Sequence, residues 1–423
     1  MATSRAVDVT SEPELTAEGS PVSRTRMILV LGALVALGPL TLDIYLPALP
    51  RITAELSVSS SVTQLTLTGT LAGLALGQLI VGPLSDSLGR RKPLMAGIVL
   101  HMLASLVCLM APNIEVLGIA RVLQGVGASA AMVVAIAVVG DLFDDSAAAV
   151  VLSRLMLVLG VAPVVAPSLG AAVLLHASWH WVFAVLVVLA GGLFLVAAFA
   201  LPETLPVAHR RPLRLGAVGS TYLALLRDVR FVILVLVAAL AMSGLFAYIS
   251  GASFVLQGRY GLTQQVFAIV FGAGAVSFIT ASQVNVVLLK RFSPQNIVVA
   301  ALCFGVVAGA AFVGLASAHV GGLAAFLVPV WSILASMGLV IPNAPALALS
   351  RHHEAAGTAA ALLGAAQFGI GAAVSPVVGL LGNDELALAV VMTTGVVVAL
   401  LALVLVISRG TSGLRGRTDA APA

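Results

Sequence analysis

Apolar residues gather into long runs along this chain, and short polar stretches or glycine- and proline-containing stretches separate the runs. Twelve runs can be recognised, at residues 27–49, 63–84, 93–111, 116–141, 149–175, 181–201, 231–256, 265–289, 296–317, 320–346, 356–381 and 386–407. Each is long enough to cross a bilayer as an α-helix, and none alternates as a barrel strand does. Since an open sheet cannot cross lipid, the pattern predicts an all-α membrane protein with twelve transmembrane helices.

The polar segments between the runs divide the chain into two equal sets of helices. The longest connection, residues 202–230, is rich in Pro and Arg and leaves six runs on either side. We therefore expect a disordered cytoplasmic tail at 1–26, a bundle at 27–201, a cytoplasmic linker at 202–230, a second bundle at 231–407 and a cytoplasmic tail at 408–423. Two pseudo-symmetric six-helix bundles are typical of transporters, whose sites lie near the bilayer midplane between the repeats.

Composition supports the membrane assignment and excludes several other classes. The chain is 60% hydrophobic and 9% charged, whereas soluble domains are about 25% charged. Its net charge of +4 does not indicate a nucleic-acid partner, because basic residues are not interleaved with aromatic ones. Cys108 and Cys303 both lie inside apolar runs, so no disulfide framework is expected. No metal site, cofactor site or ATP-binding loop is recognised, and an enzyme is not expected.

The distribution of Lys and Arg predicts the orientation. With a cytoplasmic N-terminus, only Arg51, Arg121 and Arg259 of the 21 lysines and arginines fall away from the cytoplasmic side. Since positive loops stay inside, both termini are expected in the cytoplasm, with the protein in the cell (inner) membrane.

Two charged residues inside the apolar runs are the main candidates for chemistry. Asp43 is the only charged residue of the first run and Arg121 lies near the start of the fourth. At 1.5 Å per residue they lie about 9 Å and about 7.5 Å from the outer ends of their segments, and therefore at similar depth. Charges at membrane depth usually face a bundle interior and serve function. The alternatives are a structural carboxylate near the interface for Asp43 and a snorkelling side chain for Arg121.

Several motifs resemble those of one known family. The loop after the second run reads Gly82-Pro83-Leu84-Ser85-Asp86-Ser87-Leu88-Gly89-Arg90-Arg91-Lys92, which resembles the signature loop of the major facilitator superfamily. Further stretches resemble its Bcr/CflA branch of drug:proton antiporters; they are Thr41-Leu42-Asp43-Ile44-Tyr45-Leu46-Pro47, Arg121-Val122-Leu123-Gln124-Gly125, Gly160-Val161-Ala162-Pro163, Leu201-Pro202-Glu203-Thr204-Leu205, Ser253-Phe254-Val255-Leu256-Gln257 and Ile341-Pro342-Asn343. The resemblance covers about residues 27–407 and implies the major facilitator fold. Some positions depart from that branch: Ile136 and Gly140 replace a basic residue, His180 replaces another, and Ala171 replaces a glycine.

The resemblance implies roles for individual residues. Asp43 and Arg121 would couple transport to protons. A mostly apolar cleft with a few polar groups would bind a small amphiphilic drug-like substrate; its candidate contacts are Tyr45, Gln124, Phe246, Tyr248, Phe254, Asn343, Gln367 and Phe368. The candidate gating residues are Gly82, Asp86, Gly89, Arg90, Arg91, Gly160, Pro163, Pro167 and Gly170. Asp86 would meet the start of the eleventh segment near Ala356, and the fifth segment would bend at its prolines. His101 is expected to be a packing residue.

We therefore expect a proton-coupled multidrug or antibiotic efflux antiporter, for compounds such as chloramphenicol or bicyclomycin, that acts as a monomer by alternating access. A proton-linked sugar or metabolite transporter on the same fold is the alternative. It would usually carry more charged residues in its second half, whereas here segments seven to twelve lack charges in their central stretches. A receptor or scaffold would have no need of a buried carboxylate.

Overall fold

The structure is a computed structural model that describes residues 24–143, 145–210, 212, 215–349 and 355–418 together with the short segments 14–15 and 21–22. Within these residues, twelve helices are long and apolar enough to span a membrane, which confirms the predicted all-α membrane fold. The first six are α1 (Arg24–Asp43), α3 (Ser60–Leu88), α4 (Arg91–Leu109), α5 (Ile114–Leu142), α6 (Asp145–His176) and α7 (His180–Ala200). The other six are α9 (Val229–Ser253), α10 (Gln264–Leu288), α11 (Pro294–Ala318), α12 (Gly322–Leu349), α13 (Ala356–Leu380) and α14 (Glu385–Thr418).

Short polar residues fix where several of these helices begin. Ser59, Asn113, Thr263 and Ser293 each accept a hydrogen bond from the backbone N–H three residues later, at the starts of α3, α5, α10 and α11. Asp228 does the same for the first turn of α9. The first turn of a helix leaves backbone N–H groups unpaired, and each of these side chains satisfies at least one of them. The caps therefore fix the residues at which the helices begin.

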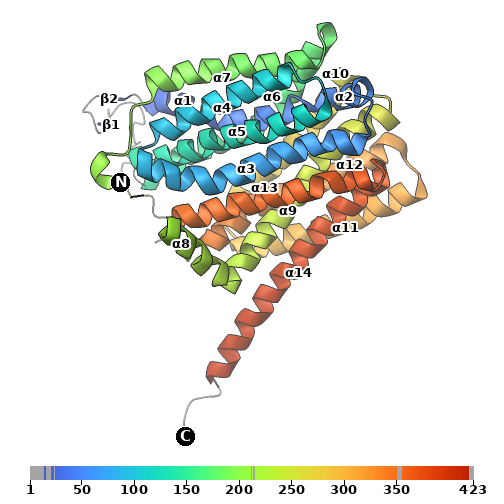
Figure 1. The fold of residues 1–423 in the computed structure, drawn as a ribbon. Helices are drawn as coiled ribbons and strands as arrows, with labels where there is room; N and C mark the ends of the chain where they lie inside the picture. Colours follow the sequence, from blue (N-terminus) through green and yellow to red (C-terminus); the bar gives the residue numbers. More distant parts are fainter. Residues whose placement is uncertain are drawn as a thin grey trace, which may run out of the picture.

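The helices form two halves that lie against each other (Figure 1). Helices α1, α3, α4, α5, α6 and α7 pack together as the N half, and α9 to α14 pack together as the C half. The halves meet chiefly where α3 packs on α13 and where α6 packs on α10. Figure 1 also shows α14 continuing away from the bundle beyond the other helices.

Hydrogen bonds cross between the halves at one end of the molecule. Ser253 Oγ donates to the carbonyl oxygen of Leu46 at 2.7 Å, and Gln64 Nε2 donates to the carbonyl oxygen of Ser250 at 3.0 Å. Gln64 Nε2 also donates to Asn383 Oδ1 at 2.6 Å. We call this end the joined end, and the opposite end, which carries Arg90, the basic end.

The first transmembrane segment is interrupted directly after Asp43. The sequence predicts a helix through residue 49, but α1 ends at Asp43 and is followed by a 3₁₀ turn η1 (Leu46–Ala48) and a short helix α2 (Leu49–Glu55). Pro47 explains the break, because it has no N–H to donate to the carbonyl oxygen of Asp43, four residues earlier, and its ring would crowd that oxygen. Asp43 is therefore placed at a helix end inside the N half.

The segments outside the bundles have some structure of their own. The connection between the halves contains a 3₁₀ turn η2 (Val207–His209) and a helix α8 (Leu215–Arg227), whose Tyr222 Oη donates to the carbonyl oxygen of Leu79 at 3.2 Å. Two-residue strands β1 (Glu14–Leu15) and β2 (Pro21–Val22) pair antiparallel. Helix α14 runs to Thr418, past the expected end at residue 407. The rest of the expected tails lies outside the described residues.

Candidate functional site

Asp43 is buried at the end of α1, with 2% of its surface exposed. Its Oδ1 atom is enclosed and has no hydrogen-bond partner among the described residues. An ionised carboxylate without partners is costly in such surroundings, so a buried, unpaired carboxyl calls for an explanation beyond packing. This is the environment in which a carboxyl group can carry a proton.

Arg121 on α5 is completely buried. Its Nη1 atom donates to the carbonyl oxygen of Thr41 at 2.9 Å and to Gln124 Oε1 at 2.6 Å. The guanidinium carbon lies 4.6 Å from the ring centroid of Tyr45, in cation–π contact. The Nε and Nη2 atoms find no hydrogen-bond partner in the described part of the chain. Arg121 therefore does not snorkel to the membrane surface but points into the N half.

The two charged residues lie in one neighbourhood without forming an ion pair. Arg121 bonds to the backbone of Thr41, two residues before Asp43 in the same helix. Among the ion pairs of the described residues, none joins Asp43 to Arg121. The arrangement leaves both groups with unused hydrogen-bonding atoms in this conformation.

A closed set of hydrogen bonds holds Arg121 in place, and we call it the polar ring; its members are Thr41, His101, Ser105, Arg121 and Gln124. Gln124 Nε2 donates to Ser105 Oγ at 2.7 Å, and Ser105 Oγ donates to the carbonyl oxygen of His101 at 2.7 Å. Thr41 Oγ1 lies 2.8 Å from His101 Nε2, and Arg121 completes the ring through Thr41 and Gln124. The ring joins α1, α4 and α5.

The hydrogen-bond geometry of the ring fixes the tautomer of His101. Thr41 Oγ1 donates its single proton to the carbonyl oxygen of Leu37 at 2.6 Å, so it must accept from His101 Nε2. The other ring nitrogen, Nδ1, is buried and has no partner. His101, expected to be a packing residue, is therefore also part of the polar ring.

Glycines allow the elements around Asp43 and Arg121 to approach closely. A β-carbon at Gly127 would lie 2.6 Å from the backbone nitrogen of His101. A β-carbon at Gly170 on α6 would overlap the carbonyl oxygen of Ile44, directly after Asp43. Gly170, predicted to take part in gating, thus supports the turn that holds Asp43.

Tyr45 packs beside Arg121 rather than in an open position. Its ring lies 5.6 Å from that of Phe183, and its Oη atom is 2.6 Å from Thr66 Oγ1. Thr66 Oγ1 donates to the carbonyl oxygen of Thr63, so Tyr45 donates to Thr66. Tyr45 and Gln124 are both fully buried, and their predicted contact with a substrate stays a prediction.

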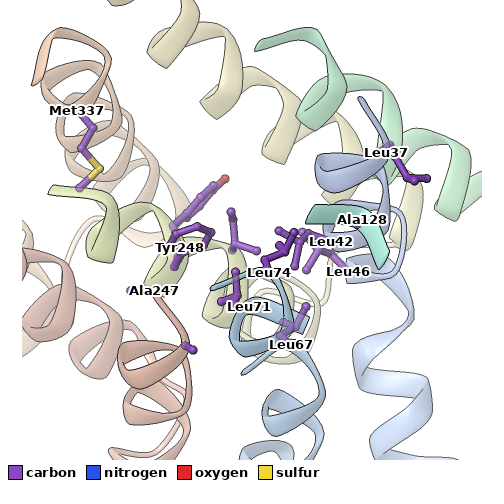
Figure 2. Close-up of a cluster of buried hydrophobic side chains, with 14 of the residues drawn as sticks. Leu37, Leu42, Leu46, Leu67, Leu71, Leu74, Ala128, Ala247, Tyr248 and Met337 are labelled. Atoms are coloured by element: carbon purple, nitrogen blue, oxygen red, sulfur yellow. The ribbon is translucent and has the colours of Figure 1, made fainter. Parts of the chain in front are cut away.

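The candidate substrate residues of the C half form separate pairs. Phe246 on α9 lies 5.9 Å from Phe368 on α13, and Tyr248 stacks on Phe271 of α10 at 5.0 Å. Figure 2 shows Tyr248 in the same buried cluster as Leu42, Leu71 and Leu74 of the N half.

The remaining candidates of the C half lie elsewhere in it. Asn343 Nδ2 on α12 donates to Asn285 Oδ1 on α10 at 2.6 Å, and both side chains are buried. Phe254 begins the π-helical turn η3 (Phe254–Arg259), and Gln367 is half-buried on α13. The structure therefore does not gather these residues at a single point, and their role in substrate binding stays a prediction.

The predicted loop motif is anchored within the N half at the basic end. Arg90 donates from Nε to Asp141 Oδ2 at 2.8 Å and from Nη2 to Asp141 Oδ1 at 3.2 Å, and it also forms an ion pair with Asp86. Burial lowers the pKa of Arg90, but the hydrogen bonds and charges of Asp141 and Asp86 outweigh burial and hold its pKa above the usual value. This forked pair ties the end of α3 to the end of α5.

Other residues of the loop motif show why it turns where it does. Gly89 has a φ of +89°, a left-handed conformation that favours glycine. Glu203 accepts from the backbone N–H of Arg90 at 2.8 Å and of Arg91 at 3.3 Å. No atom of the described residues lies within 4 Å of the position of a β-carbon on Gly82. The expected contact of Asp86 adjoins residues 350–354, which lie outside the described residues, so the latch stays a prediction.

The gating motif of the fifth segment lies at the interface between the halves. A β-carbon at Gly160 of α6 would lie 3.1 Å from Ile279 Cγ1 on α10. Pro163 and Pro167 follow inside α6. The same helix therefore touches the C half at one position and the turn after Asp43 at another, while its role as a seal stays a prediction.

Three residues of these sites were not singled out from the sequence. Thr41 and Ser105 complete the polar ring, and Trp331 on α12 has a buried Nε1 atom without a partner. Ser105 follows His101 by four residues and so shares its helix face, which was a usable signal. Trp331 had no such signal beyond being the only tryptophan of the second half.

The chain matches one family model and several known proteins over most of its length. The family model of the Major Facilitator Superfamily matches residues 31–376. A transporter of this type from Bacillus subtilis, named YdgK and described as uncharacterised, is 38% identical over 90% of this chain and 96% of its own length. A bicyclomycin resistance protein homolog from Haemophilus influenzae is 31% identical with the same coverage. A chloramphenicol resistance protein from Pseudomonas aeruginosa is 31% identical over 79% of both chains.

Solved structures show the same fold at lower identity. The xylose transporter XylE from E. coli, in a partially occluded inward open conformation, matches with a TM-score of 0.70 at 14% identity. The match covers 89% of this chain and 96% of that one. At this level of identity the likeness concerns the fold alone.

Proposed function

Because this chain belongs to the major facilitator superfamily, and is thus a multi-pass membrane transporter and not an enzyme, we propose that it exports drug-like compounds in exchange for protons. Support for drug export comes from relatives named for bicyclomycin and chloramphenicol resistance at about 30% identity. Support for proton coupling comes from Asp43 and Arg121.

One observation carries the proposal: a carboxyl and a guanidinium are buried in the same part of the N half, and each keeps atoms without partners. Ionising Asp43 without a cation at hand is costly, so the carboxyl would hold its proton in this conformation. A small movement that brings Arg121 to Asp43 would favour the charged form and release the proton. The conformation without an Asp43–Arg121 ion pair would thus be the one that holds the proton, and a conformation with the pair would be the one that releases it.

The transport cycle follows from this change in protonation. In the outward-open state Asp43 takes up a proton, and the compound leaves. In the inward-open state the proton leaves toward the cytoplasm, and binding of the next compound favours its departure. Only the conformation with the halves joined at one end is described, and we assign the joined end to the outside of the membrane and the basic end to the cytoplasm.

The energy of one proton suffices for useful export. A proton moving down 100 mV releases about 2.3 kcal/mol. Since a tenfold concentration ratio requires about 1.4 kcal/mol, about 60 mV supports a tenfold gradient of a neutral compound in one-for-one exchange.

The orientation and assembly belong to the same proposal. The excess of Lys and Arg at the basic end supports cytoplasmic termini and a place in the inner membrane. A monomer would suffice for proton coupling, because the polar ring closes between helices of the N half alone.

Transport into vesicles with an imposed pH gradient tests the proposal. Purified protein is reconstituted, and the uptake of chloramphenicol and of xylose is measured with and without the gradient. We expect chloramphenicol to move against the proton in the wild type and to lose its dependence on the gradient in Asp43→Asn. Xylose moving with the proton, with chloramphenicol unmoved, would contradict drug export and support a sugar transporter.

A further inference from the structure

Two buried hydrogen-bonding groups of the C half lie beside the same glycine and have no partner within the part of the chain that the structure describes. Tyr248 on α9 is 1% exposed, and its Oη atom makes no hydrogen bond. The Nε1 atom of Trp331 on α12 is likewise enclosed and unpaired. The position of a β-carbon on Gly274 of α10 would lie 3.1 Å from both atoms. Three helices therefore bring two unused polar groups together over one glycine.

Hydrogen bonds and ring stacking hold the helices around these two groups in place. Ser277 Oγ donates to the carbonyl oxygen of Gly274 at 2.7 Å and to that of Trp331 at 3.2 Å, which ties α10 to α12 at this level. The ring of Tyr248 stacks on Phe271 with an interplanar angle of 7°. An unpaired buried donor costs about 1–3 kcal/mol, so two of them beside a side-chain-free glycine need a partner that no described residue supplies.

The chemistry of the groups restricts what they can bind. Trp331 Nε1 is a donor only, and the hydroxyl of Tyr248 can also donate, so both suit an acceptor oxygen. Helices α10, α11, α12 and α13 contain no Asp, Glu, Lys or Arg. A cationic ligand would find no counter-charge there, whereas a neutral group would avoid the cost of burying a charge.

We propose that Tyr248, Trp331 and Gly274 form the substrate-orienting site of this transporter, and that it selects uncharged aromatic compounds carrying a hydrogen-bond acceptor such as a nitro or carbonyl oxygen. The acceptor receives hydrogen bonds from Tyr248 Oη and Trp331 Nε1 beside Gly274. Of these three residues, Tyr248 lies next to the N half, since Figure 2 shows it in one cluster with Leu71 and Leu74. This inference rests on the proposed drug export and narrows its substrate class.

Equilibrium binding to purified protein in nanodiscs tests the site directly. The probes are chloramphenicol, which is neutral with nitro and amide acceptors, and tetraphenylphosphonium, which is cationic and has no acceptor. Trp331→Phe and Tyr248→Phe each remove one donor and keep the aromatic ring. Each should raise the Kd for chloramphenicol by about 2- to 12-fold, the loss of one neutral hydrogen bond, and leave any binding of tetraphenylphosphonium unchanged.

A matched variant controls for loss of a tryptophan. Trp181→Phe on α7 changes a side chain that is 58% exposed and should leave the Kd unaltered. If one donor variant does not fold, as judged by gel filtration, the other still decides the question. Gly274→Ala serves as an additional variant, because its methyl group would crowd both donors, and it should weaken chloramphenicol binding as well.

The outcomes separate this inference from the proposed function. Unchanged chloramphenicol binding in both donor variants, or a wild type that binds the cation in preference to the neutral compound, would overturn the inference. Either result would leave proton-coupled export standing if Asp43→Asn still uncouples transport. Conversely, wild-type protein that binds chloramphenicol through the two donors but shows no proton-linked transport would refute the proposed function alone.

Discussion

Each half is a bundle of six long helices, but the two halves differ in the polar groups they bury. In the N half, a carboxyl, a guanidinium and an imidazole lie within three adjoining helices, and the polar ring holds two of them. In the C half, the buried polar groups are amides, hydroxyls and an indole. Asn285 and Asn343 pair with each other there, while Tyr248 and Trp331 have no partner. We interpret the N half as the place of proton coupling and the C half as the place of substrate selection.

Removing Arg121 should have the largest effect among the substitutions that test this division. Arg121→Ala leaves Gln124 and the backbone of Thr41 without their donor and removes the cation near Asp43. Losing one partner from a buried charged network costs about 2–5 kcal/mol. Proton-driven uptake into vesicles should therefore fall by at least about 30-fold.

Arg259 provides the matched control from the C half. Its side chain is 47% exposed and forms an ion pair with Glu385 at 2.6 Å. Although Glu385 is only 13% exposed, the guanidinium of Arg259 is half-exposed and screened by solvent, so Arg259→Ala should lower uptake less than Arg121→Ala does. The reverse order, with Arg259→Ala uncoupled and Arg121→Ala normal, would refute the division between the halves.

Replacing a glycine at a close helix contact by alanine should destabilise either half. It should change proton coupling only when the glycine lies in the N half. A β-carbon at Gly170 would overlap the carbonyl oxygen of Ile44, and one at Gly338 would overlap that of Phe278 in the C half. Overpacking of this kind costs about 1–3 kcal/mol, so both alanine variants should melt earlier in a thermal scan. Only Gly170→Ala should also change the pH dependence of uptake.

Gly192 is the control for these two variants. Nothing lies within 4 Å of the position of a β-carbon at Gly192 on α7. Gly192→Ala should therefore retain the melting temperature of the wild type. If Gly170→Ala behaved like Gly192→Ala in both stability and pH dependence, α6 would not support the turn after Asp43 as we infer.

The buried amide pair tests the C half by itself. Asn343→Ala removes the donor to Asn285 Oδ1 and leaves that buried acceptor unpaired. The expected loss of stability is about 1–3 kcal/mol. The ratio of protons to substrate, measured from paired fluxes, should stay as in the wild type; a changed ratio would place part of the coupling in the C half.

Breaking the polar ring at its edge should weaken proton coupling less than removing Arg121. Ser105→Ala removes the acceptor for Gln124 Nε2 and leaves that buried donor unpaired, which should cost about 1–3 kcal/mol of stability and weaken proton-driven uptake less than Arg121→Ala does. Ser168→Ala is the control, because Ser168 also donates to the carbonyl oxygen four residues earlier but is exposed on α6. Equal effects of the two substitutions would show that the ring does not position Arg121.

The fold could be predicted from the sequence because lipid restricts the possibilities. Twelve apolar runs have to be helices in a bilayer, and all twelve are found. The break after Asp43 was missed even though Pro47 and Pro50 follow it. Hydropathy averages over such a stretch, whereas the helix end depends on individual backbone donors.

The candidate site could be predicted only in part. Asp43 and Arg121 stand out because charges are rare in apolar runs, and the polar ring brings Arg121 to the end of α1. Thr41 and Ser105 did not stand out, since a hydroxyl in a membrane helix usually bonds to its own backbone. Trp331 could not be recognised from the sequence. Its Nε1 atom becomes a candidate only because the packing of three helices buries it without a partner among the described residues.

Substrate-induced proton release tests the central claim most directly. Purified protein in a lightly buffered solution is mixed with chloramphenicol, and the change in pH is followed with an indicator dye. If Asp43 is the carboxyl that exchanges its proton when a compound binds, the wild type should acidify the solution and folded Asp43→Asn protein should not. Equal acidification by both proteins would place the proton on another group and contradict the account.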